Sequence, residues 1–547
     1  MTCRYCGNEI KEDAKFCPFC GAANKEFQAE IAPETPEESK PRIGLLIGIA
    51  VAVIVVVALV LALFGGLFSN PKGQVEKAAA KTAAAYAQAE KAMGLPDLSY
   101  MSREQSYSQR FALTLNSINS AAAGYDLDAL SGLGLGLDAN LDGKGRQLDF
   151  SLSLFWGEED LLKLLAAADD AEFYFNSPQL TGEALYGVNT ETLGADLAAR
   201  GAEDVGNVSF NLFDLIDSAL EQMDPEQMEQ SLREANRALW EDAQVEKLGA
   251  RTLTVNGAST KTKAYQVTIP EGALNQYVDH LESILSAMNY FSLYEEMLQM
   301  IGMPQEEIDS FMGQLQELDV YGQLADSLRE LIAQAGDLEL EVCLSGGYVS
   351  AVLYEGEIFR SNVELGLYLG GGQEYVDDLS LELTVDSIKT TIKSTGDHGG
   401  KSGQFTDKTT IKSDAFGVFV PSITSEFLYE PARTADNLSW ELSIPGAGSL
   451  DMAGTLSAGA DSISLELDDM AVKVVGMEVC SLGLEYYAGP FAGAAPDGDV
   501  QIITQMDEDQ LMQMVLDTQE RALAWSEEME ELFLSRLPAE LYYSMMY

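Results

Sequence analysis

The stretch LDFSLSL at residues 148–154 alternates apolar and polar side chains. A strand with one buried face has this period of two, whereas an amphipathic helix repeats its apolar residues every three or four positions. The same alternation returns at residues 379–385 and at residues 463–467. The sequence therefore predicts antiparallel strands in three separate parts of the chain.

Helical patterns lie around and between these strands. An Ala-rich stretch at residues 74–93 ends at Gly94, and Asp224 followed by Pro225 is a typical helix start. A last helix is expected over residues 507–537, where apolar residues recur at helical spacing. Leu274, Val278, Leu281 and Leu285 fall on one helical face, and helical pattern continues to about residue 334.

The order of these elements predicts the fold class. Strands, helices, a long antiparallel meander and a final helix indicate one large α+β domain over residues 71–547. We expect a curved antiparallel sheet covered by helices on one face. This order of elements is similar to that of bacterial lipoprotein carriers, and the similarity implies an apolar cavity that binds a lipid.

Residues 43–64 predict a membrane span. The stretch Ile43–Phe64 contains 22 residues without a charge, and a helix of that length spans ~33 Å, which matches the hydrocarbon core of a bilayer. It is too long for the apolar part of a cleaved signal peptide. Within it, the small residues Gly44, Gly48 and Ala52 recur at every fourth position. This spacing permits a homodimer through close helix packing, although such residues are common in membrane helices.

Residues 1–26 predict a zinc ribbon. Cys3, Cys6, Cys17 and Cys20 form C-x2-C-x10-C-x2-C, which can supply four thiolates to one tetrahedral zinc ion. So short a segment cannot fold on a hydrophobic core alone, so the metal would stabilise it. The alternative is a pair of disulfides in an exported segment. An acidic, Pro-containing linker follows at residues 27–42.

The cysteines also predict the topology. Free zinc-binding thiolates persist in a reducing compartment, so we expect the N-terminus to be cytoplasmic. With a single membrane span, residues 71–547 would then be extracytoplasmic. Positive charges flank the span almost equally and do not decide its orientation.

The first 70 or so residues resemble a known group of proteins. The knuckles CRYCG and CPFCG, the acidic linker and one apolar helix are similar to the start of bacterial zinc-ribbon membrane proteins, including the teicoplanin-resistance-associated family. The resemblance implies a cell-envelope protein with its bulk outside, and it carries the four zinc ligands over to Cys3, Cys6, Cys17 and Cys20. It implies no activity.

The charge excludes one class of partner. The chain has 33 Lys+Arg and 87 Asp+Glu, a formal net charge of -54, so nucleic acid is not expected as a partner. A cationic or an apolar ligand fits better.

The ribbon itself has balanced charge, which indicates contact with a cytoplasmic protein. Only two histidines are present, so His-based catalysis is not expected.

Residues 138–149 fit the spacing of a calcium loop, D-x-N-x-D-G-x5-D. The candidate ligands are Asp138, Asn140, Asp142 and Asp149. Period-two alternation on both sides favours a β-hairpin instead, with its turn at Asp142-Gly143. We expect the hairpin, and calcium binding stays open.

Three other features have a structural interpretation. The stretch GDHGGKS at residues 396–402 resembles a phosphate loop, but its glycine spacing is wrong, so it predicts a hairpin loop. His280 lies off the apolar face of its expected helix and should be solvated. Cys343 and Cys480 could form a disulfide or remain free thiols.

Three functions are compatible with the sequence. The first is a non-enzymatic, membrane-anchored envelope protein whose outer domain senses or binds and whose ribbon contacts another protein. The second is an outer domain that binds a lipid or another apolar ligand. The third is an envelope enzyme that uses carboxylates. The first is our prediction, so no catalytic residue and no cofactor other than structural zinc is expected.

Overall fold

Strands account for most of the chain that the computed structural model describes. It describes residues 71–539 and 542 with the exception of residues 97, 99–100, 102–105, 120–126, 202–210, 215, 218–224, 256–257, 288–294, 296–297, 300–302, 318–319, 359–360, 371–376, 400–402, 417–421 and 494–497. All of them belong to one structural unit, Ala62–Tyr547, whose described part is called the sheet domain below.

Along the chain, the described strands come in groups: six strands, then two strands between helices, then eleven strands, and last one short strand. The first eight are β1 (Ser106–Ile118), β2 (Leu133–Asp142), β3 (Gln147–Trp156), β4 (Glu159–Ala168), β5 (Glu172–Asn176), β6 (Leu185–Asn189), β7 (Gln244–Val255) and β8 (Ala258–Ile269). The others are β9 (Leu338–Ser345), β10 (Tyr348–Ile358), β11 (Ser361–Gly370), β12 (Asp378–Val385), β13 (Ile388–His398), β14 (Phe405–Ser413), β15 (Ile423–Tyr429), β16 (Leu438–Ile444), β17 (Gly448–Ala458), β18 (Ile463–Val474), β19 (Met477–Gly489) and β20 (Val500–Ile502). The strands predicted around residues 148–154, 379–385 and 463–467 are confirmed as β3, β12 and β18.

The helices of the described residues are fewer. They are α2 (Pro71–Ala92), α5 (Leu193–Ala199), α7 (Pro225–Asp242), α8 (Glu271–Ala287), α10 (Gln305–Glu317), α11 (Val320–Ala335) and α12 (Glu508–Arg536), with short 3-10 turns η2 (Asp128–Leu130), η3 (Asp414–Phe416) and η4 (Ile503–Gln505). The predicted first and last helices are confirmed as α2 and α12. Asp507 caps α12 in a capping box with Gln510, which satisfies two backbone donors at the start of the helix.

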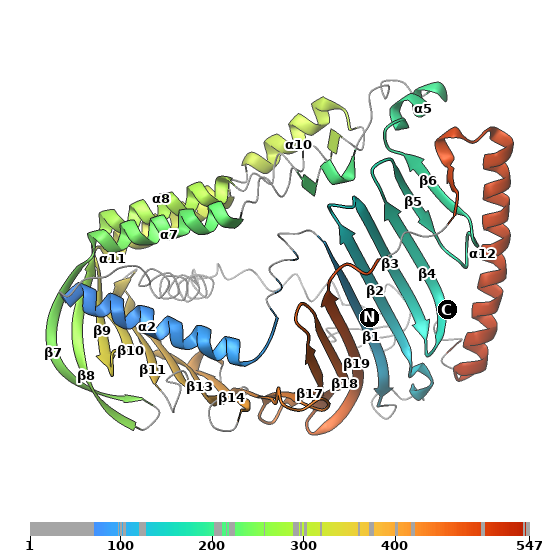
Figure 1. The fold of residues 1–547 in the computed structure, drawn as a ribbon. Coiled ribbons are helices and arrows are strands. Elements are labelled where there is room, and N and C mark those ends of the chain that lie inside the picture. Colours follow the sequence, from blue (N-terminus) through green and yellow to red (C-terminus); the bar gives the residue numbers. More distant parts are fainter. Residues whose placement is uncertain are drawn as a thin grey trace, which may run out of the picture. The chain divides into compact units, whose positions relative to one another are not determined.

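Twenty strands of the described residues form one continuous sheet (Figure 1). Its spatial order runs from β7 through β19 in sequence order, continues with β1 through β6, and ends at β20. All neighbours are antiparallel except β20 and β6, which are parallel. The sheet is open, with β7 and β20 at its two edges. The pairing of β1 with β19 joins the early strands to the late ones.

The two faces of the sheet are distinguished by the strand register, because directly paired residues point to the same face. We call the face that carries Tyr265 the inner face and the opposite one the outer face. The helix α2 packs on the inner face, where Tyr265 Oη donates to Gln74 Oε1 at 2.7 Å. On the same helix, Thr82 Oγ1 accepts a hydrogen bond from the Val349 amide at 2.9 Å.

The described helices that contact the inner face lie at one end of it. The helix α2 contacts β7, β9 and β10, α7 contacts β8, and α11 contacts β10. Figure 1 shows these helices gathered over the β7–β11 end of the sheet, whereas α12 runs beside the strands of the other end. There, Trp156 and Leu161 of the sheet pack with Leu537 and with residues of α12 in a second core.

The predicted fold class is therefore wrong in its main feature. We expected an α+β domain with a sheet covered by helices on one face, but the structure is a large open sheet with few helices. A sheet of twenty strands is much wider than the short helices of this chain can cover. The described helices that contact the inner face do so at its β7–β11 end.

The predicted localisation must also be corrected. No helix of the residues that the structure describes is long and apolar enough to cross a membrane, which is against a single-pass protein with a cytoplasmic N-terminus and an extracytoplasmic domain. The apolar stretch 43–64, on which that prediction was based, lies outside the described residues, as do the dimer candidates Gly44, Gly48 and Ala52.

Candidate functional site

Apolar side chains line the inner face from one end of the sheet toward the other. One row of directly paired residues crosses eight strands without a polar member: Tyr265, Val342, Val352, Leu367, Leu381, Ile392, Ile411 and Ile423. Further along, a second row joins Leu467, Leu484, Leu113, Leu135, Leu154 and Leu162. The alternation seen in the sequence therefore places apolar residues on the same face in distant strands.

Burial differs sharply between the two ends of this face. Under the helices, Tyr265 and Val342 are each 1% exposed and Leu367 is 8% exposed. On β1–β5, seven large apolar side chains of the same face are 37–44% exposed. They are Phe111, Leu135, Phe150, Leu154, Leu164, Phe173 and Phe175, and we call them the open apolar surface.

The register shows that these seven residues are neighbours. Leu135 pairs with Leu154, and Phe111 pairs with Leu137, which continues through Leu152 to Leu164. On β4, Ala166 pairs with both Phe150 and Phe175. Single exposed apolar residues are ordinary, but a contiguous group marks an interaction site. The open apolar surface is such a group.

A polar cluster lies on the inner face of β13 and β14, beside the apolar row that crosses these strands. His398 lies between two carboxylates: its Nδ1 is 3.3 Å from Asp377 Oδ1 and its Nε2 is 3.6 Å from Asp407 Oδ2. Ser394 Oγ donates to Asp407 Oδ2 at 2.6 Å, and Thr409 Oγ1 donates to Asp407 Oδ1 at 2.7 Å. We call these five residues the His398 cluster.

The electrostatics of this cluster favour a charged imidazole. The pKa of His398 is raised above its ordinary value of 6.5, first by the hydrogen bond with Asp407 and then, against the effect of burial, by that with Asp377. Burial acts to raise the pKa of Asp407, but hydrogen bonds from His398, Ser394 and Thr409 outweigh it, so this pKa lies below its ordinary value. Both nitrogens of His398 face acceptors, and Ser394 bonds to Asp407 rather than to His398. The arrangement therefore provides no base beside a hydroxyl nucleophile.

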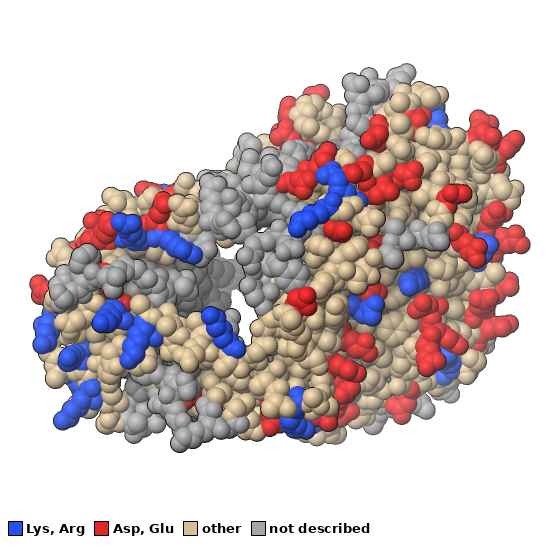
Figure 2. Space-filling model, viewed as in Figure 1, with Lys and Arg blue, Asp and Glu red and all other residues tan. Residues whose placement is uncertain are grey.

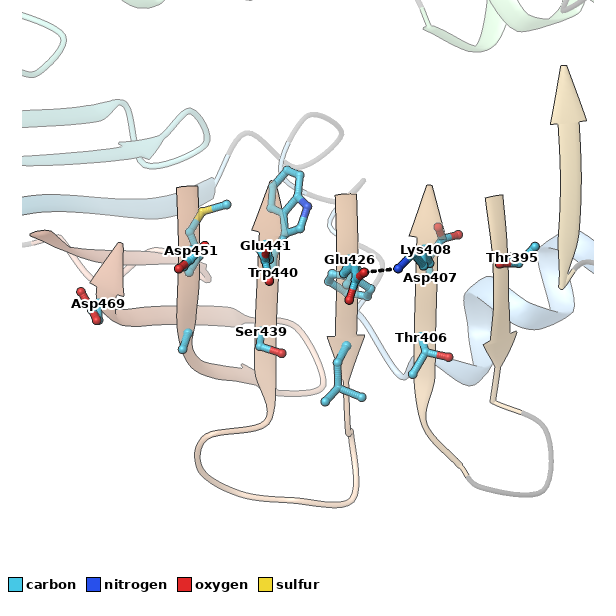
Figure 3. A pocket seen from close by; sticks show the side chains of 14 residues that line it. Thr395, Thr406, Asp407, Lys408, Glu426, Ser439, Trp440, Glu441, Asp451 and Asp469 are labelled. Atoms are coloured by element: carbon cyan, nitrogen blue, oxygen red, sulfur yellow. Dashed lines mark hydrogen bonds and ion pairs between the residues drawn. The ribbon is translucent and has the colours of Figure 1, made fainter. Parts of the chain in front are cut away.

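A polar pocket of about 600 Å³ lies across β13–β18. Most of its lining residues are on the outer face, and Lys408, Glu426, Glu441 and Asp451 are paired in one row across β14–β17. Figure 3 shows this row at one level of adjacent strands, with Lys408 bonded to Glu426. Like charges directly opposite destabilise a sheet unless they are compensated.

Lysines compensate the two ends of this row. Lys473 Nζ lies 2.5 Å from Asp451 Oδ2, and this hydrogen bond lowers the pKa of Asp451. Glu441, between Glu426 and Asp451, pairs with no basic side chain of the described residues. The pocket is thus acidic and polar.

The calcium-loop candidates lie on strands. Asn140 on β2 is paired with Asp149 on β3, and its Nδ2 donates to Asp149 Oδ1 at 2.5 Å. Arg110 Nε is 2.6 Å from Asp138 Oδ1, and Asp142 accepts from the Gly145 amide in the turn. The predicted hairpin is confirmed. The described part of the chain contains no group of three or more His, Cys, Asp or Glu side chains that could hold a metal ion.

The other candidates have structural roles. Cys343 and Cys480 are free thiols, and burial raises the pKa of the Cys343 thiol to about 11, so this group is inert. His280 is exposed on α8, as predicted. Of the stretch 396–402, residues 396–398 end β13 and pair with β14 in a hairpin, and residues 400–402 lie outside the described residues. Its interpretation as a loop missed His398, because the partner Asp377 is distant in sequence.

Charge is distributed unevenly over the surface. Figure 2 shows Lys and Arg gathered near the β7–β8 end and Asp and Glu concentrated over the opposite end, including α12. The strands β7 and β8 carry Lys247, Arg251, Lys261 and Lys263. The large net negative charge of the chain is therefore not uniform, and its two ends differ in the ligands they attract.

Comparison with known proteins concerns the N-terminal end. Cys3, Cys6, Cys17 and Cys20 lie outside the described residues. Neither a curated protein nor a solved structure matches the chain. The family model of the zinc-ribbon domain matches residues 2–24, which contain all four cysteines, and this match supports zinc binding at the start of the chain.

Proposed function

We propose that this chain is a non-enzymatic binding protein that holds a ligand with acyl chains on the inner face of its sheet. The observation that carries the proposal is the open apolar surface, where seven large side chains of one face remain 37–44% exposed. Burial of apolar area contributes roughly 25 cal/mol per Å². A ligand that covers this surface therefore gains stability that the chain's own helices do not supply.

The chemistry of a sheet face favours hydrocarbon over an extended peptide. An extended peptide carries one N–H and one C=O in almost every residue, and these groups need hydrogen-bond partners when they are buried. The face of β1–β5 presents side chains rather than backbone, and its exposed members are Phe and Leu. An acyl chain has no polar group to satisfy.

At the other end of the chain, we propose that Cys3, Cys6, Cys17 and Cys20 bind one structural zinc ion and that the ribbon contacts another protein. The support is the match of residues 2–24 to the zinc-ribbon domain, together with four thiolates at the spacing of a tetrahedral site. The balanced charge of residues 1–26 favours a protein over nucleic acid as the partner. The narrower resemblance to the teicoplanin-resistance-associated family stays a prediction.

Lipid binding is tested with the full chain and a phosphatidylcholine that carries one pyrene-labelled acyl chain. The lipid is titrated by fluorescence, and lipid extracted from the purified protein is analysed by mass spectrometry. We expect saturable binding that weakens about tenfold or more when Leu135→Gln and Leu164→Gln are combined, since each tenfold is about 1.4 kcal/mol.

Met477→Gln is the matched control, because Met477 is 66% exposed but lies at the start of β19, outside the open apolar surface. It should leave binding unchanged. Absence of saturable binding contradicts the proposal, as does an equal loss in the Met477→Gln variant. Recovery of a polypeptide instead of a lipid would assign the open apolar surface to a protein partner.

A further inference from the structure

The helix α12 has apolar residues on two different sides. One side packs on the sheet domain: Trp525 Nε1 donates to the Leu161 carbonyl at 2.6 Å, and the rings of Phe533 and Trp156 lie 5.6 Å apart. Met529 and Leu532 join the same core. These positions recur every three or four residues and define the inward side of the helix.

A second apolar stripe lies on the solvent side. Met512 is 62% exposed, Leu523 59%, Val515 53%, Leu516 51% and Leu534 45%. At 100° per residue, Met512, Leu516, Leu523 and Leu534 fall within about 40° of each other and about 60° or more from every inward position, whereas Val515 lies at the edge, in the direction of Phe533. The stripe extends from Met512 to Leu534, or ~33 Å. An ordinary surface helix carries polar residues at these positions.

Acidic residues run along one flank of this stripe. They are Asp509, Asp517, Glu520, Glu527, Glu528 and Glu531, and all of them are exposed. None makes an ion pair with a basic residue of the described chain. The helix as a whole contains eight acidic and two basic residues. Figure 2 shows the same end of the molecule to be rich in Asp and Glu.

We infer that the solvent side of α12 is the docking site of a cationic amphipathic helix of a partner protein. Apolar residues at helical spacing match the apolar face of another helix. The adjacent carboxylates match Lys and Arg on its flank, and this complementarity directs association and register. A second copy of α12 fits poorly, because two helices of the same negative charge would repel each other. This site is separate from the open apolar surface and does not depend on lipid binding.

The test uses the full chain and two labelled synthetic peptides of 22 residues, both made of Leu and Lys in equal proportions. In the patterned peptide Leu occupies one helical face, and in the scrambled peptide Leu is spread around the helix. Both carry the same charge, so non-specific attraction to an acidic protein is the same for both. Fluorescence anisotropy should give a dissociation constant at least about tenfold lower for the patterned peptide.

Substitutions locate the site. Leu516→Gln with Leu523→Gln should remove the preference for the patterned peptide, while Glu520→Gln with Glu527→Gln should reduce the salt dependence of binding. Val474→Gln with Met477→Gln changes exposed apolar residues at the end of β18 and the start of β19. This double variant should keep both the preference for the patterned peptide and the salt dependence of binding. Leu135→Gln with Leu164→Gln, on the open apolar surface, should keep both as well. Circular dichroism confirms that α12 remains folded in each variant.

Equal affinity for the two peptides overturns the inference. So does a preference that survives Leu516→Gln with Leu523→Gln. Sedimentation equilibrium provides the third decisive result: a dimer that dissociates in that double variant would assign the stripe to a second copy of the chain and reject a cationic partner.

Discussion

His398 Nε2 lies 3.6 Å from Asp407 Oδ2, and its Nδ1 faces Asp377 on the other side. The imidazole is therefore stabilised in its charged form on the inner face, beside the apolar row that crosses β12–β14. Its pKa is raised and that of Asp407 is lowered, so each group is more stable in its charged state in the folded protein.

The first prediction is a pH dependence of stability. A raised histidine pKa contributes stability that is fully present below its unfolded value of 6.5 and is lost as pH rises through the folded value. The lowered pKa of Asp407 contributes stability that is present above 3.8 and is lost as pH falls through the folded value. Urea unfolding between pH 5 and pH 9 should show the free energy of unfolding fall on the alkaline side.

His398→Gln should flatten this alkaline decline. NMR titration measures the pKa of His398 directly, and a value at or below 6.5, or an unchanged decline in the variant, contradicts the prediction.

The second prediction concerns the turn between β18 and β19. Val475 has φ 51° and Gly476 has φ 76°, which correspond to a two-residue turn with both residues in the left-handed region. A β-branched residue is strained there, and Asn is tolerated. Val475→Asn should raise the free energy of unfolding by about 1 kcal/mol. Val474→Asn, at the preceding strand position, is the control, and chemical denaturation should show no gain for it.

The third prediction separates the core from the open apolar surface on one strand. Leu161 is 1% exposed in the core formed with Trp156 and Leu537, whereas Leu164 is 40% exposed on the inner face. Leu161→Ala should lower the free energy of unfolding by about 2–5 kcal/mol, because it leaves a cavity. Leu164→Ala should cost about 1 kcal/mol or less. Similar losses in the two variants would mean that the inner face of β4 is covered.

The fourth prediction concerns zinc. Cys17→Ser should abolish binding of one zinc ion per chain, because a ribbon with three thiolates loses its closed tetrahedral site. The thermal transition of the sheet domain should not change. Cys343→Ser and Cys480→Ser are matched controls that retain the metal, since these thiols lie on β9 and β19. Zinc content is measured by a chromogenic chelator after denaturation, and full zinc in the Cys17→Ser variant would refute the site.

Local features were predictable from the sequence. The alternation at residues 148–154 predicts β3 because the period of side-chain direction in a strand is a property of neighbouring residues alone. The same is true of the hairpin at Asp142-Gly143 and of the cap at Asp507, which depend on residues within a few positions. The cysteine spacing of the ribbon belongs to this class too.

The candidate sites were not predictable in this way. The partners of His398 are Asp377 and Asp407, and only the pairing of β12, β13 and β14 brings them to one face. The open apolar surface has the same sequence pattern as the covered one. Leu135 and Leu367 both alternate with polar or small residues, yet one is 44% exposed and the other 8%.

By itself, the sequence determined the strands around residues 148–154, 379–385 and 463–467, the places of α2 and α12, and the cysteine spacing that the zinc-ribbon model matches. The tertiary structure alone decided that β1 pairs with β19 and that the described helices contact the inner face at its β7–β11 end. The reason is physical. Strand pattern and turn chemistry depend on neighbours along the chain. Which strand pairs with which, and which helix packs on which strand, depends instead on contacts between residues hundreds of positions apart. The entropy cost of closing such long loops and the energy gained by packing leave no local pattern in the sequence.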